Sequence, residues 1–98
     1  RTRSGKNLAS KARYTLRFTR SASRDLGRID IPFQKIIKEK LLILASNPAA
    51  LANNITRLTN TEYFRLRVGN YRIIFEKREK ELVVLVVRIG HRSEVYDR

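Results

Sequence analysis

The spacing of apolar residues changes twice along this chain, and the changes divide it into three parts. Residues 14–19 alternate between apolar and polar, which is typical of a strand with one buried face. From residue 33 to residue 45 apolar residues recur every three or four positions, as on the buried stripe of a helix. From residue 63 the period returns to two. The order of strand, helices and strands predicts an α+β fold.

Two helices are predicted between the first strand and the second half of the chain. Ser21 or Ser23 can cap a short helix over residues 22–28, because a side-chain oxygen satisfies a free amide at the helix start. Asp30 can cap the second helix in the same way. The second helix ends at Asn47, since the residue before a proline disfavours helical backbone angles.

The second half of the chain predicts three or four strands joined by tight turns. Residues 49–60 lead into it as a loop with one helical turn at most. Gly69 and Asn70 both tolerate positive φ and predict a hairpin turn, and residues 78–80 predict a second turn. The apolar run 82–87 is typical of a strand covered on both faces. The expected strands are residues 63–68, 71–76, 82–87 and a short one over residues 94–96.

These elements predict a single α+β domain over residues 14–98. In it the N-terminal strand and two helices pack on an antiparallel sheet of about four strands. Residues 1–13 are polar and basic, and we expect them to form a flexible tail. Because the helices bury one face of the sheet, Arg65 and Arg67 on the other face should lie in solvent.

Net charge dominates the composition, because 22 Lys and Arg residues oppose 9 Asp and Glu residues and give +13. Such self-repulsion is typical of proteins that bind nucleic acid, an anionic membrane surface or an acidic protein. Arginine outnumbers lysine, and guanidinium groups suit bidentate contacts with phosphate, which favours nucleic acid. Without cysteine and without an apolar run that could span a membrane, the chain is expected to be cytoplasmic.

Candidate catalytic side chains are restricted to a few types. One His, no Cys and scattered carboxylates predict neither a metal site nor a cofactor. Metal-free cleavage of RNA needs a base for the 2′-OH, cations for the phosphoryl oxygens and an acid for the leaving 5′-oxygen. Side chains of these types gather in the C-terminal half of the chain, namely Arg65, Arg67, Arg72, Arg88, His91, Arg92 and Tyr96.

The same side chains also fit a simpler interpretation. Arginines at alternate positions of an exposed strand are ordinary solvated residues, and Tyr63 and Tyr71 are expected to pack on the sheet. His91 fits a hydrogen-bonded structural histidine as well as a catalytic one. Charge and periodicity therefore predict a nucleic-acid-binding α+β domain and leave catalysis open.

Two sequence blocks carry a resemblance to a known family. Residues 63–75 read Tyr-Phe-Arg-Leu-Arg-Val-Gly-Asn-Tyr-Arg-Ile-Ile-Phe, and residues 82–96 end in Gly-His-Arg-Ser-Glu-Val-Tyr. Together with the first strand and the two helices, these blocks resemble the RelE/ParE toxin superfamily over residues 14–96. The resemblance implies the toxin of a type II toxin-antitoxin pair, with a sheet backed by two helices.

The resemblance is strongest to the RelE members, which cut mRNA in the ribosomal A site without a metal ion. In them, attack by the 2′-OH leaves a cyclic phosphate. The resemblance therefore implies an endoribonuclease, or mRNA interferase, that inhibits translation, needs no cofactor and does not act at a membrane. The implied partners are mRNA in the A site of the 30S ribosomal subunit and a cognate antitoxin, in a toxin-antitoxin hetero-oligomer.

The family pattern also implies roles for individual residues. Arg65 stands where a basic residue binds or activates at the scissile site, and Arg72 where an arginine contacts the phosphate. Arg92 fits a second phosphate-stabilising arginine, and Tyr96 a tyrosine that stacks on a base or assists proton transfer. The predicted catalytic residues are Arg65, Arg72, Arg92, Tyr96 and His91, and the predicted RNA-binding residues are Arg67, Arg88 and Lys77.

One departure from the family pattern concerns the general base. Tyr63 stands where some relatives have a lysine. His91 is the candidate to fill this role, because imidazole is a better base at neutral pH than guanidinium.

Two alternative functions share the same fold. A ParE-like toxin would inhibit DNA gyrase by binding it, and a non-catalytic module would only bind nucleic acid or an antitoxin. The retained basic and aromatic residues favour the ribonuclease over both.

Overall fold

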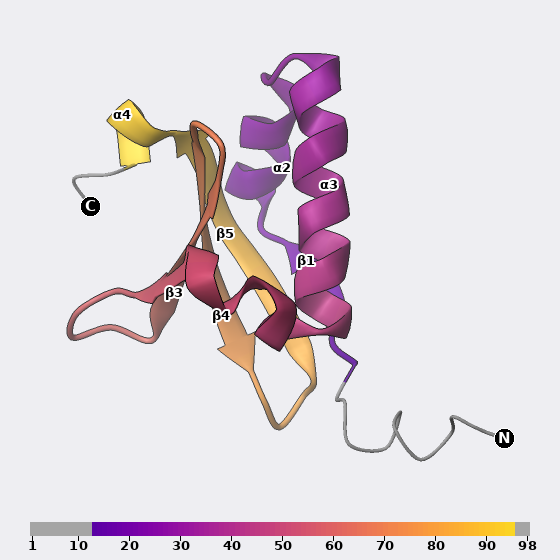
Figure 1. Ribbon diagram of the computed structural model, residues 1–98, viewed down its shortest axis with the longest axis vertical. Coiled ribbons are helices and arrows are strands. Elements are labelled where there is room, and N and C mark those ends of the chain that lie inside the picture. Colours follow the sequence, from indigo (N-terminus) through magenta and orange to yellow (C-terminus); the bar gives the residue numbers. More distant parts are fainter. Residues whose placement is uncertain (1–12, 96–98) are drawn as a thin grey trace, which may run out of the picture.

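The computed structural model describes residues 13–95 and contains one five-stranded sheet with helices packed against it (Figure 1). The strand order across the sheet is β1-β5-β4-β3-β2, and the expected α+β fold is confirmed. Most of the predicted basic tail lies outside the described residues. The elements are β1 (Thr15–Phe18), α2 (Arg20–Gly27), α3 (Ile31–Ser46), η1 (Pro48–Asn54), β2 (Ile55–Arg57), β3 (Tyr63–Val68), β4 (Tyr71–Arg78), β5 (Val83–His91) and α4 (Arg92–Val95).

The two predicted helices are present, but the cap of the first is not the expected residue. Thr19 caps α2, because its hydroxyl accepts a hydrogen bond from the Ala22 N–H at 3.0 Å. The predicted caps, Ser21 and Ser23, lie inside the helix, which begins directly after β1. Asp30 stands at the N-cap position of α3 as predicted, but its side chain makes no capping hydrogen bond. That helix ends before Asn47, as expected.

The first strand joins the sheet in a way that the sequence did not predict. β1 lies at the edge of the sheet and runs parallel to β5, with Thr15–Phe18 opposite Val83–Val86. The sheet is therefore mixed and has five strands, whereas we expected an antiparallel sheet of about four. Alternation identifies a strand, but it gives neither its partner nor its direction.

A short strand occupies part of the segment predicted to be a loop. Residues 48–54 form the expected helical turn as a 3₁₀ helix, and Ile55–Arg57 then pair with β3 in antiparallel fashion. Three residues are too few for a period of two to show in the sequence.

The end of the described chain is helical, so the strand predicted over residues 94–96 is wrong at Glu94 and Val95, and Tyr96 lies outside the described residues. Arg92–Val95 form one turn, α4, directly after β5. The final pair of the β4–β5 ladder joins Tyr71 to His91, and Tyr71 is the first residue of β4. Residues 92–95 therefore have no residue of β4 left to pair with.

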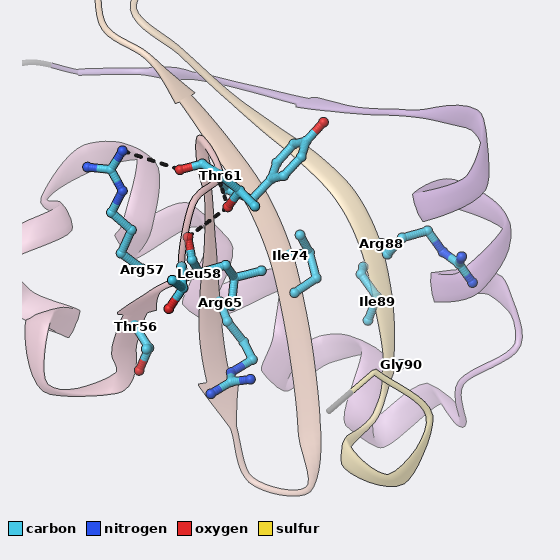
Figure 2. Close-up of a pocket in the computed structure, with 11 residues that line it drawn as sticks. Thr56, Arg57, Leu58, Thr61, Arg65, Ile74, Arg88, Ile89 and Gly90 are labelled. Carbon is cyan, nitrogen blue, oxygen red and sulfur yellow. Dashed lines mark hydrogen bonds between the residues drawn. The ribbon is translucent and has the colours of Figure 1, made fainter. Parts of the chain in front are cut away.

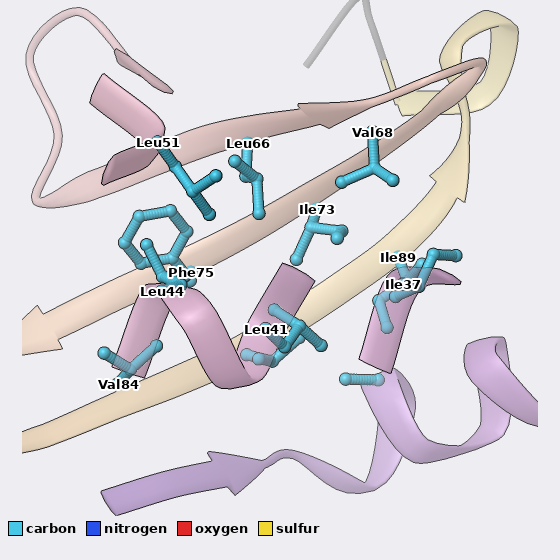
Figure 3. Packing of buried hydrophobic residues seen from close by; sticks show 12 residues of the cluster. Ile37, Leu41, Leu44, Leu51, Leu66, Val68, Ile73, Phe75, Val84 and Ile89 are labelled. Atoms are coloured by element: carbon cyan, nitrogen blue, oxygen red, sulfur yellow. The ribbon is translucent and has the colours of Figure 1, made fainter. Parts of the chain in front are cut away.

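The hydrophobic core lies between α3 and one face of the sheet (Figure 3). Ile37, Leu41 and Leu44 of α3 are buried against the sheet. The strand run predicted to be covered on both faces is fully buried at Val84 and Val86 only, because helices cover a single face. The sheet side chains of the core are Leu66, Val68, Ile73, Phe75, Val84, Val86 and Ile89.

Replacing Leu41 with alanine should destabilise the fold by about 2–5 kcal/mol, because the side chain is fully buried and its loss leaves a cavity. Urea denaturation followed by circular dichroism measures the change. Leu42→Ala is the matched control, since Leu42 is 62% exposed and should change stability by less than about 0.5 kcal/mol. Equal losses in the two variants would contradict the assigned packing of α3.

Candidate functional site

The β3–β4 hairpin determines which arginines share the open face, the face of the sheet opposite α2 and α3. Gly69 has a φ of 58°, and the predicted two-residue turn is confirmed. The resulting register places Arg67 opposite Arg72, and Arg65 opposite Ile74. Because Leu66 points into the core and side chains alternate along a strand, these arginines all belong to the open face.

Three of these side chains, Arg65, Arg67 and Arg72, line one shallow pocket of about 220 Å³, called here the arginine pocket. Asn53, Asn54 and Thr56 complete its wall. Like charges directly opposite each other on neighbouring strands are destabilising, so Arg67 facing Arg72 favours a role in binding an anion. Nη1 of Arg72 also donates to the carbonyl oxygens of Gly69 at 2.9 Å and Tyr71 at 3.0 Å, which anchors its guanidinium.

A larger groove of about 680 Å³ adjoins the arginine pocket (Figure 2). One side of it is lined by residues 56–59, Thr61 and Tyr63, and the other by residues of β4 and β5. Ile74 contributes a buried apolar surface, and Arg65 lines both the groove and the pocket. The two hollows therefore form a continuous basic surface on the open face.

Arg57 is a basic residue of this groove that the sequence analysis missed. Its Nη2 donates to the Thr61 carbonyl oxygen at 3.2 Å (Figure 2). Its guanidinium carbon lies 5.8 Å from the centre of the Phe64 ring. The segment was predicted to be a loop, so nothing in the sequence tied Arg57 to a sheet face. In the structure β2 pairs Arg57 with Phe64 of β3, and the Arg57 side chain lies at the rim of the groove.

Arg88 points toward α2 and away from Arg65 (Figure 2). Its Nε donates to Oδ2 of Asp25 at 2.8 Å, and its Nη2 to Oδ1 at 3.4 Å. The backbone N–H of Ile89 donates to the same Oδ2 at 2.9 Å. Burial alone would raise the pKa of Asp25, but these hydrogen bonds and the charges of Arg88 and Arg28 together lower it.

Two predicted site residues, His91 and Lys77, lie on the helix side of the sheet. The His91 ring meets the Tyr71 ring edge-on, 5.8 Å between centres, in an apolar hollow that Phe33 of α3 also lines. Nζ of Lys77 lies 5.9 Å from the centre of the Tyr14 ring. The structure does not bring either side chain into the arginine pocket.

Arg92 lies at the end of β5, against the β3–β4 turn. Its backbone N–H donates to the Asn70 carbonyl oxygen at 2.8 Å, and its side chain is exposed. Tyr96 lies outside the described residues, so its predicted role stays a prediction.

The described part of the chain, residues 13–95, holds neither a metal-binding cluster nor a membrane-spanning helix. Among its side chains, no group of three or more His, Asp or Glu residues could hold a metal ion. None of its helices is long and apolar enough to cross a membrane.

The fold is that of RelE toxins. The chain superposes on the toxin-antitoxin complex RelBE2 from Mycobacterium tuberculosis with a TM-score of 0.71 and 26% identity, covering 84% of this chain and 94% of that one. It also superposes on the free RelE toxin of Escherichia coli with a TM-score of 0.70 and 22% identity, covering 87% and 92%.

Sequence comparison shows the family. Residues 16–96 match the family described as ParE toxin of type II toxin-antitoxin system, parDE, and the chain belongs to it. It is 30% identical to toxin RelG of Mycobacterium tuberculosis, over 87% of this chain and 98% of the relative. It is 27% identical to the mRNA interferase toxin RelE of Escherichia coli, over 85% of this chain and 90% of that one.

Replacing Asp25 with alanine should lower the free energy of unfolding by about 1–3 kcal/mol at neutral pH, because the Ile89 N–H loses its acceptor. Folding depresses the pKa of Asp25, so its contribution is complete above the pKa of the unfolded chain and is lost as the pH falls through the folded-state value. The difference between wild type and variant should therefore shrink below about pH 4. Denaturant titrations at several pH values measure it.

Asp30→Asn is the control for this measurement, because the Asp30 side chain makes no capping hydrogen bond. It should change stability by less than about 0.5 kcal/mol. A wild-type advantage over Asp25→Ala that persists unchanged to pH 2 would contradict the ionised Asp25–Arg88 pair.

Proposed function

We propose that this toxin is an endoribonuclease that cuts mRNA bound in the ribosomal A site. The observation that carries the proposal is the arginine pocket, where three guanidinium groups on neighbouring strands line one shallow hollow. Such a cluster suits a phosphate that gains negative charge as it reacts. The names of two relatives, which call RelE an mRNA interferase, support the same activity.

The proposed reaction needs no metal ion and no cofactor. The ribose 2′-oxygen attacks the adjacent phosphorus and the bond from phosphorus to the 5′-oxygen breaks. The products are a 2′,3′-cyclic phosphate and a free 5′-hydroxyl, so the proton lost at the 2′-oxygen is balanced by one gained at the 5′-oxygen. Arg65, Arg67 and Arg72 hold the phosphoryl oxygens, and holding the strand in line with the attack adds to the rate.

The C-terminal end of β5 supplies the remaining proposed groups. Arg92 adds a second phosphate contact and Tyr96 stacks on a base or assists proton transfer. His91 is the proposed general base. Its ring lies on the helix side of the sheet. Because the 2′-OH lies next to the phosphate that it attacks, the His91 ring must turn toward the open face to take its proton. Lys77 packs against Tyr14 and is left out of this proposed site.

Primer extension on programmed ribosomes tests the activity. Wild-type protein should cut the A-site codon with no metal ion beyond those that the ribosome requires. Arg72→Ala should slow cleavage about 10²- to 10³-fold, because it removes a donor to the developing charge. Arg20→Ala, which removes an exposed arginine from α2, should cut at the wild-type rate. Intact mRNA with the wild-type protein would refute the proposal.

Inhibition of DNA gyrase is the second candidate function, because the matching family is described as that of ParE toxins. Accumulation of cleaved DNA in a gyrase assay, with ribosome-bound mRNA left intact, would favour it over the ribonuclease.

We also propose that an antitoxin neutralises this toxin in a hetero-oligomer. Several similar structures are complexes of RelE with a RelB antitoxin. The basic open face suits an acidic partner, and α3 exposes large apolar side chains that an amphipathic partner would cover, namely Ile31, Phe33, Ile36 and Leu42.

Native mass measurement of the toxin purified from its own cells tests this partnership. The mass should exceed that of the 11.5 kDa chain by at least one acidic second chain. A toxin that elutes as the 11.5 kDa chain alone, from cells that tolerate it, would contradict the antitoxin proposal.

A further inference from the structure

β5 extends well beyond the end of its edge partner β1. The parallel pairing stops at Val86, whereas β5 continues to His91. Beyond this point Thr19, the first residue after β1, forms the hydrogen bonds to the edge of β5. Its backbone N–H donates to the Val86 carbonyl oxygen at 2.9 Å, and its hydroxyl donates to the Val87 carbonyl oxygen at 2.9 Å. The residue that caps α2 thus also continues the hydrogen-bonded edge of β5.

Asp25 extends the same edge one step further. Its Oδ2 accepts from the Ile89 N–H, which has no strand on that side, and its two oxygens receive the Arg88 guanidinium. The Asp25 side chain is only 9% exposed, so hydrogen bonds from these donors replace most of its contacts with water. Because it binds residues 88 and 89 at once, Asp25 fastens β5 to α2 immediately before the Gly90-His91-Arg92 segment.

That segment contributes to the surroundings of the arginine pocket. Gly90 lies opposite Arg72 in the β4–β5 register, and the Arg92 N–H bonds to the turn at Asn70. A shift of β5 at Ile89 would therefore move Arg92 relative to Arg72. The rate of a positioned reaction is sensitive to displacements of about 1 Å.

We propose that Asp25 is a positioning residue, which holds the C-terminal end of β5 against the β3–β4 turn and so fixes the position of Arg92 relative to Arg72. Arg88 belongs to the same device and acts through Asp25, not by contacting RNA. The inference rests on the proposed ribonuclease activity. It adds a buried carboxylate, 63 residues away in sequence from the arginine that it pairs with, to the groups that the reaction depends on.

A double-mutant cycle on programmed ribosomes tests the proposal. Asp25→Asn, which keeps the shape of the side chain, should lower kcat about 10- to 100-fold and leave KM for ribosomes unchanged. Arg88→Gln should do the same, and the double variant should lose no more than the larger single loss, since the two residues act as a unit. Asp30→Asn, which removes a carboxylate from the start of α3, should keep the wild-type rate.

Two outcomes of the cycle would overturn the proposal. A raised KM and a weaker salt dependence for Arg88→Gln would show that Arg88 contacts phosphate directly. Losses that multiply in the double variant would show that the two residues act independently.

Amide hydrogen exchange provides a readout that does not depend on cleavage. In Asp25→Ala the amides of residues 89–91 should exchange at least about tenfold faster than in wild type, with the Leu66 amide in β3 unchanged. If the alanine variant does not fold, Asp25→Asn is measured in its place. Unchanged exchange at residues 89–91 would overturn the positioning role. The wild-type protein could leave mRNA uncut while the amides of residues 89–91 exchange faster in the Asp25 variant. In that case the proposed function is wrong, but Asp25 still holds β5 against α2.

Discussion

A single layer of helices is the constraint on which the rest of this structure depends. The helices α2 and α3 cover one face of the five-stranded sheet, so each strand can bury only every second side chain. The remaining positions of β3 and β4 face solvent and are free to hold charged residues. The exception is Ile74, which is buried on the open face between Arg65 and Arg88 in its cross-strand row. The aliphatic stems of arginine suit such a position, because they shield apolar surface while the charge stays in water.

Local patterns account for the parts of the fold that the sequence predicted. The strands around Gly69, the turn itself and the end of α3 before Pro48 each depend on neighbouring residues only. The strand β2 has too few residues to show a pattern. The parallel pairing of β1 and the Arg92–Asn70 hydrogen bond at the start of α4 depend on partners far along the chain. For the same reason the cap of α2 was missed, since Thr19 is held in place by Val87, 68 residues away.

The arginine pocket was predictable to the extent that it follows from alternation and one turn. Arg65 and Arg67 share a face because they are two residues apart, and the turn brings Arg72 opposite Arg67. Alternation also assigns Tyr71 and Lys77 to the buried face of Ile73 and Phe75. This pattern could have predicted that Lys77 lies away from the arginines. The pairing of Asp25 with Arg88 could not be predicted from the sequence, because no local pattern joins a helix to the edge of a distant strand.

The shortness of the two edge strands has a consequence for assembly. One edge is formed by the four residues of β1, and beyond them the side chains of Thr19 and Asp25 bond to β5. The other edge is formed by the three residues of β2. Unpaired backbone at a sheet edge is a template for strand addition from another chain, and short or covered edges remove it. The sheet therefore offers a second copy of the chain very little backbone to pair with, and the net charge of +13 repels a second copy as well.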